Sequence, residues 1–249
     1  YFQPHFKPDF NLDLLRSNNY ICHFFVVRRE IAEKTGGLRP EYNGAQDYDY
    51  IFRCTEMAGK IVHIPRVLYH WRVHSASTAD NPASKLYAYE AGKKAIEGNL
   101  ARCGEEGTVT LRSDYGFYDV DYKLRGTPLV SILIPNKDQA DTLRTCLESI
   151  KKKCMYPSYE ILIIENNSTE EATFSYYKEL EAQGIRVLKY PKQGFNYSAI
   201  NNFGVKEAKG EYLLFLNNDM EIITPDFMEK MVSNLQRPQI GAVGAKLYY

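Results

Sequence analysis

The chain has 249 residues, enough for one large domain or two small ones, and its content of 44% hydrophobic and 25% charged residues is ordinary for a soluble globular protein. Lysine plus arginine and aspartate plus glutamate each total 31, so no net charge favours nucleic acid or an anionic membrane as a partner. Apolar runs such as Ile161–Ile164 are far too short to span a bilayer, and residues 1–30 show no signal peptide.

Residues 1–80 form a first block, in which the apolar run Ile21–Val27 leads into a short helix. Gly36 and Gly37 are suited to end that helix, because glycine readily adopts the left-handed conformation common at helix ends. The predicted elements are a helix near Arg28–Lys34, a helix from Asp47 to Gly59, and strands at Lys60–Ile64 and Val67–Trp71.

Residues 81–127 are predicted to connect this block to the next. Ser84–Cys103 has a moderate helical pattern of apolar residues, and Val109–Leu124 alternates like a strand or a hairpin. The five cysteines of the whole chain are odd in number and show no CxxC or CxxH spacing. This pattern argues against a disulfide framework or a structural zinc site and favours reduced thiols in a cytoplasmic protein.

Residues 128–249 alternate between short β-branched runs and amphipathic stretches of helical length. The predicted strands are Val130–Pro135, Tyr159–Ile164, Arg186–Tyr190, Glu211–Leu216 and about Ile240–Leu247. The predicted helices are Gln139–Lys152, Glu170–Gln183, Tyr197–Ala208 and Pro225–Gln236, the last with Thr224 as its N-cap. This alternation predicts an α/β fold with a mostly parallel sheet flanked by helices, in which ligands bind at the carboxyl ends of the strands.

Polar residues follow several of these strands. Asn217-Asn218-Asp219 ends the fourth strand, where oxygen ligands would suit Mg²⁺ or Mn²⁺ bound to a diphosphate. A simple turn accounts for the same residues, because Asn and Asp favour turns. The second strand ends in Glu165 to Thr169, whose carboxylate and amides suit the edge of a base or a ribose. Here the alternative is a helix N-terminus with Ser168 or Thr169 as its cap.

The segments VSILIPNKDQADTLRTCLESI, YEILIIENNST, FNYSAINNFGVKEAKGEYLLFLNND and VGAKLYY together resemble the nucleotide-binding half of family 2 glycosyltransferases, which have the GT-A fold. The resemblance implies that Asn136 and Glu165 lie against the nucleoside and that Asn196 and Asn202 line the donor pocket. It also implies that Asp219 binds the metal. The family commonly has Asp-x-Asp where this chain has Asn217-Asn218-Asp219, which removes one charge.

The first block resembles the acceptor-side half of the same enzymes, in SNNYICHFFVVRREIAEKTGGLRPEYNGAQDYDYIFR and YHWRVHSAST. The resemblance implies that Asp47 is the general base toward the acceptor hydroxyl, that Arg72 faces the diphosphate and that His74 binds the metal. Simpler alternatives are that Asp47 and Asp49 favour the first turn of a helix and that the histidines lie at the surface.

The order of the blocks is reversed relative to a single family member. We therefore expect an internal segment of a tandem bacterial glycosyltransferase. Its parts are an acceptor-side half at 1–80, a connector at 81–127 and the donor-binding half of a second domain at 128–249. Two separate lobes are expected, and the alternative is a permuted single transferase in which Asp47 and Asp219 face one cleft.

The predicted function is inverting transfer from a nucleotide-diphosphate sugar to a glycan or lipid-linked acceptor, with Mg²⁺ or Mn²⁺, in polysaccharide biosynthesis. No Gln-x-x-Arg-Trp pattern of processive members is present, so we expect a non-processive enzyme, cytoplasmic or peripheral to the inner face of the membrane. The alternative is a non-catalytic nucleotide-sugar-binding module. A nucleotidyltransferase would need a glycine-rich basic loop, which Pro135-Asn136-Lys137-Asp138 is not. Donor sugar, acceptor and oligomeric state stay open.

Overall fold

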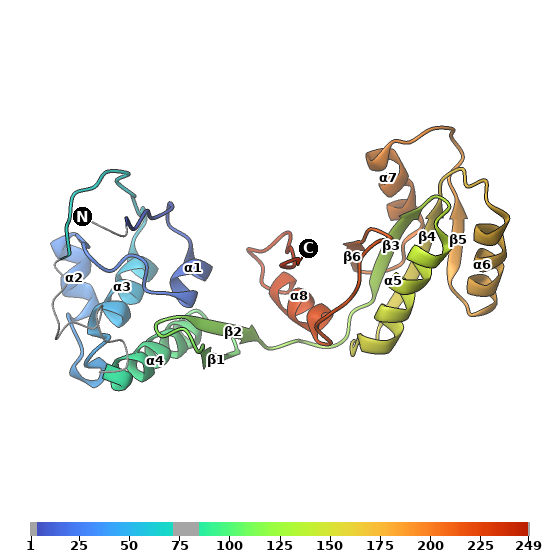
Figure 1. The fold of residues 1–249 in the computed structure, drawn as a ribbon. Coiled ribbons are helices and arrows are strands. Elements are labelled where there is room, and N and C mark those ends of the chain that lie inside the picture. The colour runs from blue at the N-terminus through green and yellow to red at the C-terminus, as the bar shows by residue number, and fades with distance from the viewer. Residues whose placement is uncertain (1–3, 72–84, 249) are drawn as a thin grey trace. The chain divides into compact units, whose positions relative to one another are not determined.

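The computed structural model describes residues 4–71 and 85–248, and the chain divides into two compact units (Figure 1). The N-terminal unit is Tyr1–Lys123 and the C-terminal unit is Leu124–Tyr249. Each has its own buried hydrophobic core, as expected for units that fold around separate interiors. They are described one after the other.

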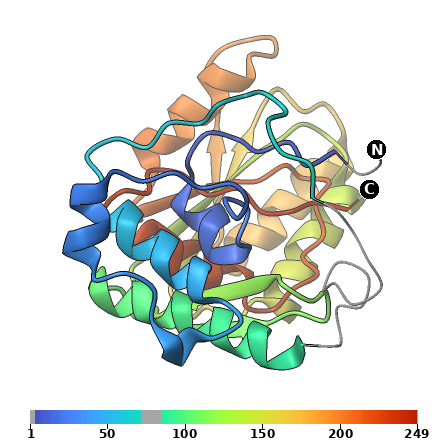
Figure 2. The same ribbon diagram turned by 90° about the vertical axis from the view of Figure 1, so that its left-hand side faces the viewer.

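The N-terminal unit is built from short helices and one hairpin. Its elements are α1 (Leu12–Ser17), α2 (Arg29–Thr35), a 3₁₀ turn (Pro40–Tyr42), α3 (Gln46–Met57), α4 (Leu86–Arg102), β1 (Gly107–Leu111) and β2 (Tyr118–Tyr122). Figure 2 turns this unit toward the viewer and shows α3 and α4 beside each other. Phe52 on α3, Ile96 on α4 and Val109 on β1 are members of one buried cluster. The core therefore lies between these two helices and the antiparallel hairpin.

The two helices predicted in the first block are confirmed as α2 and α3, and Gly36 caps α2 in the left-handed conformation with φ of 77°. The two strands predicted at 60–64 and 67–71 are wrong, because the structure assigns no strand to residues 58–71. Their apolar side chains stay exposed, with 68% of Val62 and 70% of Val67 accessible. β-branched residues stabilise a strand through packing against neighbours, and neither sheet of the described chain includes this segment.

The segment predicted as a connector contributes to the core of the N-terminal unit. The predicted helix is α4, and the predicted strand or hairpin is the antiparallel pair β1–β2. Leu100 and Tyr118 are buried in the same cluster as Tyr48 of α3. The boundary between the compact units lies between Lys123 and Leu124, close to the expected start of the second block. The assignment of the blocks to acceptor-side and donor-side halves stays a prediction.

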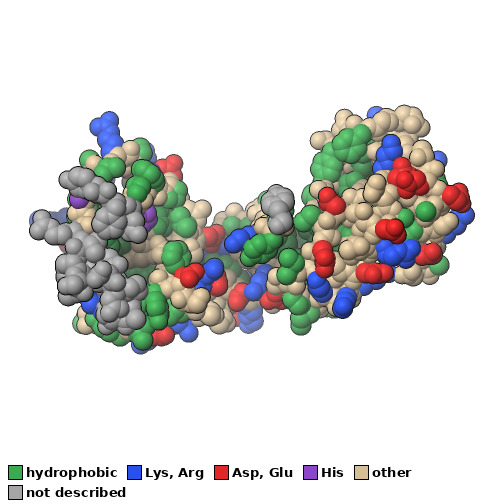
Figure 3. Space-filling model, viewed as in Figure 1, with side chains coloured by type: hydrophobic (Ala, Val, Ile, Leu, Met, Phe, Trp, Pro, Cys, Tyr) green, Lys and Arg blue, Asp and Glu red, His purple; other side chains and the backbone are tan. Residues whose placement is uncertain are grey.

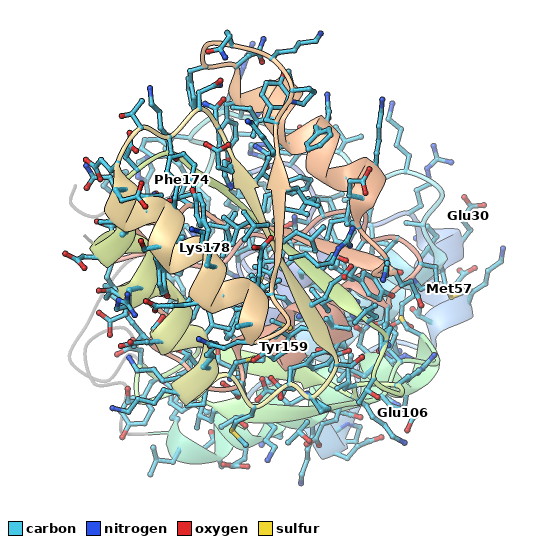
Figure 4. The ribbon with its side chains drawn as sticks, turned by 90° about the vertical axis from the view of Figure 1, so that its right-hand side faces the viewer. Glu30, Met57, Glu106, Tyr159, Phe174 and Lys178 are labelled. Carbon is cyan, nitrogen blue, oxygen red and sulfur yellow. The ribbon has the colours of Figure 1, made fainter. Side chains whose placement is uncertain are left out.

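The C-terminal unit has the predicted alternation of strands and helices. Its elements are β3 (Val130–Asn136), α5 (Ala140–Lys153), β4 (Tyr159–Glu165), α6 (Glu171–Ala182), β5 (Arg186–Lys189), α7 (Tyr197–Glu207), β6 (Tyr212–Phe215) and α8 (Phe227–Leu235). The strands form one parallel sheet in the order β5-β4-β3-β6. In Figure 4, Tyr159 at the start of β4 and Phe174 near the start of α6 mark opposite ends of this sheet.

Both faces of this sheet are covered, so successive residues of a strand enter different cores. Ile132 and Ile134 of β3 belong to the cluster that includes α5, α6 and α8, whereas Leu133 joins Ile200 of α7 on the other face. Both sets are fully buried. Continuous apolar strands are what a parallel sheet with helices on both faces requires. The predicted α/β fold with a parallel sheet is therefore confirmed for this unit.

Two details near the C-terminus differ from prediction. Residues 240–247 form no strand, and the sheet ends at β6 on that side. Helix α8 begins at Phe227 with Asp226 at its N-cap position, rather than at Pro225 after a Thr224 cap. Pro225 stays in the preceding turn, where its carbonyl accepts the amide of Met155 at 3.2 Å.

Two further features of the described chain concern its cysteines and the hydropathy of its helices. All five cysteines are free of disulfides, and no helix within residues 4–71 and 85–248 is long and apolar enough to cross a membrane. Figure 3 shows basic and acidic side chains interspersed over the visible face of the C-terminal unit, without an extended patch of one sign. This agrees with the absence of net charge in the sequence.

Candidate functional site

The carboxyl ends of the parallel strands bring the predicted polar residues of the C-terminal unit to one edge of the sheet. Asn136 ends β3 and is in register with Glu165 at the end of β4, which in turn is level with Lys189 of β5. Asn136 and Glu165 are 2% and 4% exposed. The loops that follow these strands therefore start side by side, as ligand-binding loops of this kind of sheet do.

The Asn217–Asp219 turn joins the same edge, because β6 lies directly beside β3. Asn218 points toward the interior, where its Nδ2 donates to Oδ1 of Asn136 at 2.7 Å. Asn217 and Asp219 on either side of it are exposed. Asn217 Oδ1 accepts the hydroxyl of Tyr197, the first residue of α7, at 3.2 Å. The turn therefore presents an amide and a carboxylate to solvent and is held from behind by its middle residue.

The loop after β4 is held by hydrogen bonds from the loop after β3. Glu165 Oε1 accepts the amide of Ser168 at 2.5 Å, and Ser168 Oγ accepts the amide of Asp138 at 2.9 Å. Asp138 Oδ1 in turn accepts the amides of Thr169 and Glu170 at 2.7 and 2.9 Å. The two loops thus fix each other through reciprocal bonds.

Asp138 is a residue at the candidate site whose structural role the sequence interpretation missed. The cap of α6 was expected from Ser168 or Thr169, but neither side chain caps the helix, and the free amides before α6 are satisfied by Asp138 from the neighbouring loop. Those backbone hydrogen bonds, from Glu170 and then Thr169, lower the pKa of the Asp138 carboxyl. The sequence shows an acid three residues after the predicted strand, but it does not show which backbone amides that acid accepts from.

Asn196 and Asn202 lie at and within α7. Asn196 is the N-cap, and its Oδ1 accepts the amide of Ala199 at 3.0 Å. It is exposed, as is Asn202 six residues further on. The neighbouring Asn201 is 5% exposed and donates to the carbonyl of Tyr197 at 2.9 Å. Asn196 therefore shapes the helix entrance beside the Asn217–Asp219 turn, and a contact of either Asn196 or Asn202 with a ligand stays a prediction.

The donor set of the Asn217–Asp219 turn fits a hard cation that keeps much of its own hydration. Within the described ranges, no group of three or more His, Cys, Asp or Glu side chains could hold a metal alone. Mg²⁺ is commonly bound by one or two carboxylates together with substrate phosphates and water, and this turn offers one carboxylate and one amide oxygen. The Asp219 charge acts on Cys146 behind the turn, whose pKa rises to about 11 mainly because the thiol is buried.

In the N-terminal unit, Asp47 and Asp49 on α3 occupy very different surroundings. Asp47 is partly exposed, and its Oδ2 accepts from Asn19 Nδ2 at 3.2 Å and from the Cys22 thiol at 3.1 Å. Burial, and then the Asp47 charge, raises the pKa of Cys22 to about 12, so this thiol stays protonated as a donor. Asp49 is fully buried and is bound by Arg39 and Arg53.

Arg72 and His74 fall outside the described residues. His63 lies 3.4 Å from the Asp9 carboxylate, which makes it part of a surface pair. A hollow of about 230 Å³ opens at the amino ends of β4 and β5, next to Tyr159 and Arg186. This is the opposite edge from Asn136 and Glu165, and it contains none of the predicted site residues.

The profile of the family described as Glycosyl transferase family 2 matches residues 131–249. That range takes in the parallel sheet and every loop at its carboxyl edge. Residues 131–249 belong to glycosyl transferase family 2. The C-terminal unit is thus a family 2 domain, and the candidate site lies on its strand-end loops.

Two curated relatives extend the similarity to both units. The chain is 45% identical over 246 residues to O-antigen biosynthesis protein RfbC of Myxococcus xanthus, which covers 99% of this chain and 19% of the relative. It is 42% identical over 250 residues to protein y4gI of Sinorhizobium fredii, covering 98% of this chain and 27% of that protein. The chain therefore spans 19% to 27% of the length of these relatives, and both contain its two units in the same order.

More distant matches are confined to part of the chain. Putative glycosyltransferase EpsH of Bacillus subtilis is 31% identical over 108 residues, 43% of this chain and 30% of its own length. Among solved structures, a mannosyltransferase of Pyrobaculum calidifontis in complex with GDP-Man and Mn²⁺ is matched with a TM-score of 0.41 and 17% identity, over 62% of this chain and 43% of that one. That likeness is too weak to place a ligand in the present chain.

Proposed function

We propose that the family 2 domain binds a nucleotide-diphosphate sugar with Mg²⁺ or Mn²⁺, and that the protein transfers the sugar, with inversion, to a glycan or lipid-linked acceptor in polysaccharide biosynthesis. The observation that supports this best is a coincidence of position. The family match covers residues 131–249. Within that range, the loops after the strands bring Glu165, the Asn217–Asp219 turn and the start of α7 to one edge of the sheet. The name of the M. xanthus relative supports the polysaccharide setting.

In this proposal the roles follow the chemistry of the side chains. Glu165 lies against the nucleoside, with Asn196 and Asn202 on the donor side, and Asp219 takes the cation that offsets the charge of the departing diphosphate. The acceptor-side half, residues 1–80, is proposed to serve a separate family 2 domain, in which Arg72 and His74 contact that domain's own diphosphate and cation. Inversion needs one displacement, in which the acceptor hydroxyl loses its proton as it attacks the sugar, and Asp47 is proposed as the base of the domain to which residues 1–80 belong.

The hydrogen bonds of Asp47 suit that role. Asn19 and Cys22 both donate to Oδ2, and no interaction of Oδ1 is seen within the described part of the chain. The carboxylate is thus fixed in orientation through one oxygen while the other is available to accept a proton. Asp49, two residues on, is unsuited to that task because both its oxygens are bound by arginines.

Calorimetry on this chain tests the donor-binding part of the proposal. UDP and GDP are titrated with and without Mn²⁺ into the wild type, into Asp219→Ala and into Glu221→Ala as a matched control. Glu221 is an exposed acid two residues further on that pairs with Lys153 at 3.1 Å. We expect Asp219→Ala to lose most of the affinity gained with Mn²⁺, roughly tenfold or more, and the control to keep it. Equal binding by all three proteins with and without metal would contradict the metal role.

A second candidate is a nucleotide-sugar-binding module without transfer, favoured by Asn217 at a position where the family commonly has Asp. The full-length parent protein separates the two candidates. A panel of nucleotide sugars is assayed for transfer and for hydrolysis by wild type and by Asp47→Asn. Transferase function predicts turnover, and Asp47→Asn should abolish it for the donor sugar of the domain that uses Asp47 while nucleotide binding persists. Binding without turnover of any sugar nucleotide would favour the module.

A further inference from the structure

A chain of side-chain hydrogen bonds, buried at its centre, connects the Asn217–Asp219 turn to the loop after β4. Its centre is Asn136, at the end of β3. Asn136 Oδ1 accepts from Asn218 Nδ2 at 2.7 Å, and its Nδ2 donates to the hydroxyl of Tyr177 at 2.7 Å and to the carbonyl of Asp138 at 3.0 Å. The side chain is only 2% exposed. Both amide hydrogens and one oxygen lone pair of Asn136 are therefore used within the protein.

Tyr177 continues this chain from α6. Its side chain is 5% exposed, and its hydroxyl lies 3.4 Å from Oγ of Ser168. Ser168 is the residue whose amide donates to Glu165 and whose hydroxyl accepts from Asp138. Burial raises the pKa of Tyr177, so the hydroxyl stays neutral and keeps its proton. Asn218, Asn136, Tyr177 and Ser168 are called the relay below.

The relay connects segments that are far apart in the sequence, since Asn218 and Asn136 are 82 residues apart and Asn136 and Tyr177 are 41 apart. Each of its ends is next to a residue proposed to bind ligand. Asn218 precedes Asp219, and Ser168 donates to Glu165. A buried polar network of this kind fixes geometry because breaking one bond leaves a partner unsatisfied.

We infer that Asn136 and Tyr177 are positioning residues that set the cation-binding turn and the nucleoside-binding loop relative to each other, and so couple the binding of cation and nucleotide. This inference rests on the proposed function. It gives Asn136 a role behind the site instead of the direct nucleoside contact that the family resemblance implies, because its amide hydrogens are already bound. Cation at the turn and nucleotide at the loop then raise each other's affinity, as linkage requires.

The test measures a coupling factor, defined as the Kd for UDP or GDP without Mn²⁺ divided by that with Mn²⁺, in calorimetric titrations of this chain. Tyr177→Phe removes the hydroxyl that accepts from Asn136, and Asn218→Ala breaks the opposite end of the relay at a partly exposed position. We expect each to lower the coupling factor by about fivefold or more. The double variant should lower it no further than either single change, because both interrupt one connection.

Tyr156→Phe is the matched control. Tyr156 is 1% exposed, and its hydroxyl donates to the carbonyl of Pro128 at 2.6 Å, before the amino end of β3 and away from the site. The control likewise loses one hydroxyl and its hydrogen bond from a buried tyrosine, so its thermal midpoint should fall about as far as that of Tyr177→Phe, while its coupling factor stays that of the wild type. This comparison separates a positioning role from a general loss of stability.

Three other outcomes would contradict the inference. A wild-type coupling factor in Tyr177→Phe and Asn218→Ala overturns the inference and leaves the proposed function standing. Equal loss in Tyr156→Phe overturns it as well, because the effect would then follow stability. A wild type that binds neither UDP nor GDP, with or without Mn²⁺, overturns the proposed function and the inference with it.

Discussion

The two units bury polar groups of different kinds and in different places. In the N-terminal unit the buried polar groups include charged side chains, Arg16, Asp49 and Arg53, which pair within the unit. In the C-terminal unit they are mostly amides and hydroxyls, and those at the carboxyl ends of the strands include Asn136 and Asn166. The first arrangement holds loops onto a helical core, and the second lines the edge where the loops of the candidate site begin.

The contrast shows which buried polar groups belong to a framework and which support a site. Asp49 is held by Arg39 and Arg53, and Arg53 also donates to the carbonyls of Thr35 and Gly37 at the end of α2. Those contacts fix α2 against α3 and leave nothing for a ligand. At the strand ends of the family 2 domain, by contrast, buried side chains hydrogen-bond to the inner side of the loops. The outer side of these loops is exposed to solvent, where a ligand could reach it.

The largest effect is expected from Asp49→Ala, which leaves two arginines without their carboxylate. Removing one partner of a buried pair typically costs 3–5 kcal/mol, and we expect about 3 kcal/mol because Arg39 is a third exposed. Chemical denaturation of this chain measures it. Asp47→Ala is the control on the same helix and should cost less than about 1 kcal/mol, because Asp47 is partly exposed and its partners Asn19 and Cys22 are neutral, so no charge is left unpaired. Similar losses for the two variants would contradict the distinction between them.

The stability that Asp49 contributes depends on pH, and the direction of that dependence can be predicted. Burial by itself would raise the pKa of Asp49, but hydrogen bonds and charges from Arg39 and Arg53 outweigh it, so the pKa is lowered from its ordinary value of 3.8. The unfolded chain then binds this proton more readily than the folded one. The stabilisation is complete above that value and is lost as the pH falls through the lower folded pKa. Wild type and Asp49→Ala should therefore approach each other in stability only in strong acid.

Glycines at close helix contacts give the next largest effect and test how α4 and α7 are packed. A Cβ on Gly92 would lie 2.1 Å from the hydroxyl of Tyr118, and one on Gly204 would lie 2.4 Å from Cδ1 of Ile164. Overpacking costs about 1–3 kcal/mol, partly offset by about 1 kcal/mol of helix propensity. We expect Gly92→Ala and Gly204→Ala each to lower stability in urea denaturation.

Gly98→Ala is the control for α4. A Cβ there would meet only the tip of Arg102 at 3.1 Å and the Tyr42 hydroxyl at 3.3 Å, both of which can move. It should be neutral or stabilising. If Gly92→Ala were equally neutral, the packing of α4 against the hairpin, and with it the assignment of residues 86–122 to the N-terminal unit, would be wrong.

The smallest stability effect is expected at Asp138, whose partly exposed side chain accepts the free amides before α6 from the neighbouring loop. Asp138→Ala should lower the thermal midpoint at neutral pH by less than Asp49→Ala does, and Asp138→Asn should lie between wild type and Asp138→Ala because it keeps one acceptor oxygen. The pKa of Asp138 is lowered by the amides of Glu170 and Thr169. The difference between wild type and Asp138→Ala should therefore shrink as the pH falls below about 4. A difference that grows in acid would contradict this role.

The sequence by itself determined the helices and strands whose apolar residues recur at a regular spacing along the chain. The strands β3 to β6 and the helices α5 to α7 were predicted to within about two residues, because apolar periodicity reports directly which side of an element faces a core. It also placed Glu165 and Asp219 at strand ends, and the family resemblance carried by those segments agrees with the family match. The parallel order then required that these residues share an edge.

Only the tertiary structure decided which side chains join the loops of that edge. Asn136 reaches Asn218 because β6 lies beside β3, and Asp138 reaches the start of α6 because β4 lies on the other side of β3. Likewise, the apolar pattern of residues 60–71 predicts strands, but a strand needs a partner, and this segment has none in either sheet of the described chain. Local pattern encodes what an element can bury, whereas a hydrogen bond between distant segments depends on which elements become neighbours.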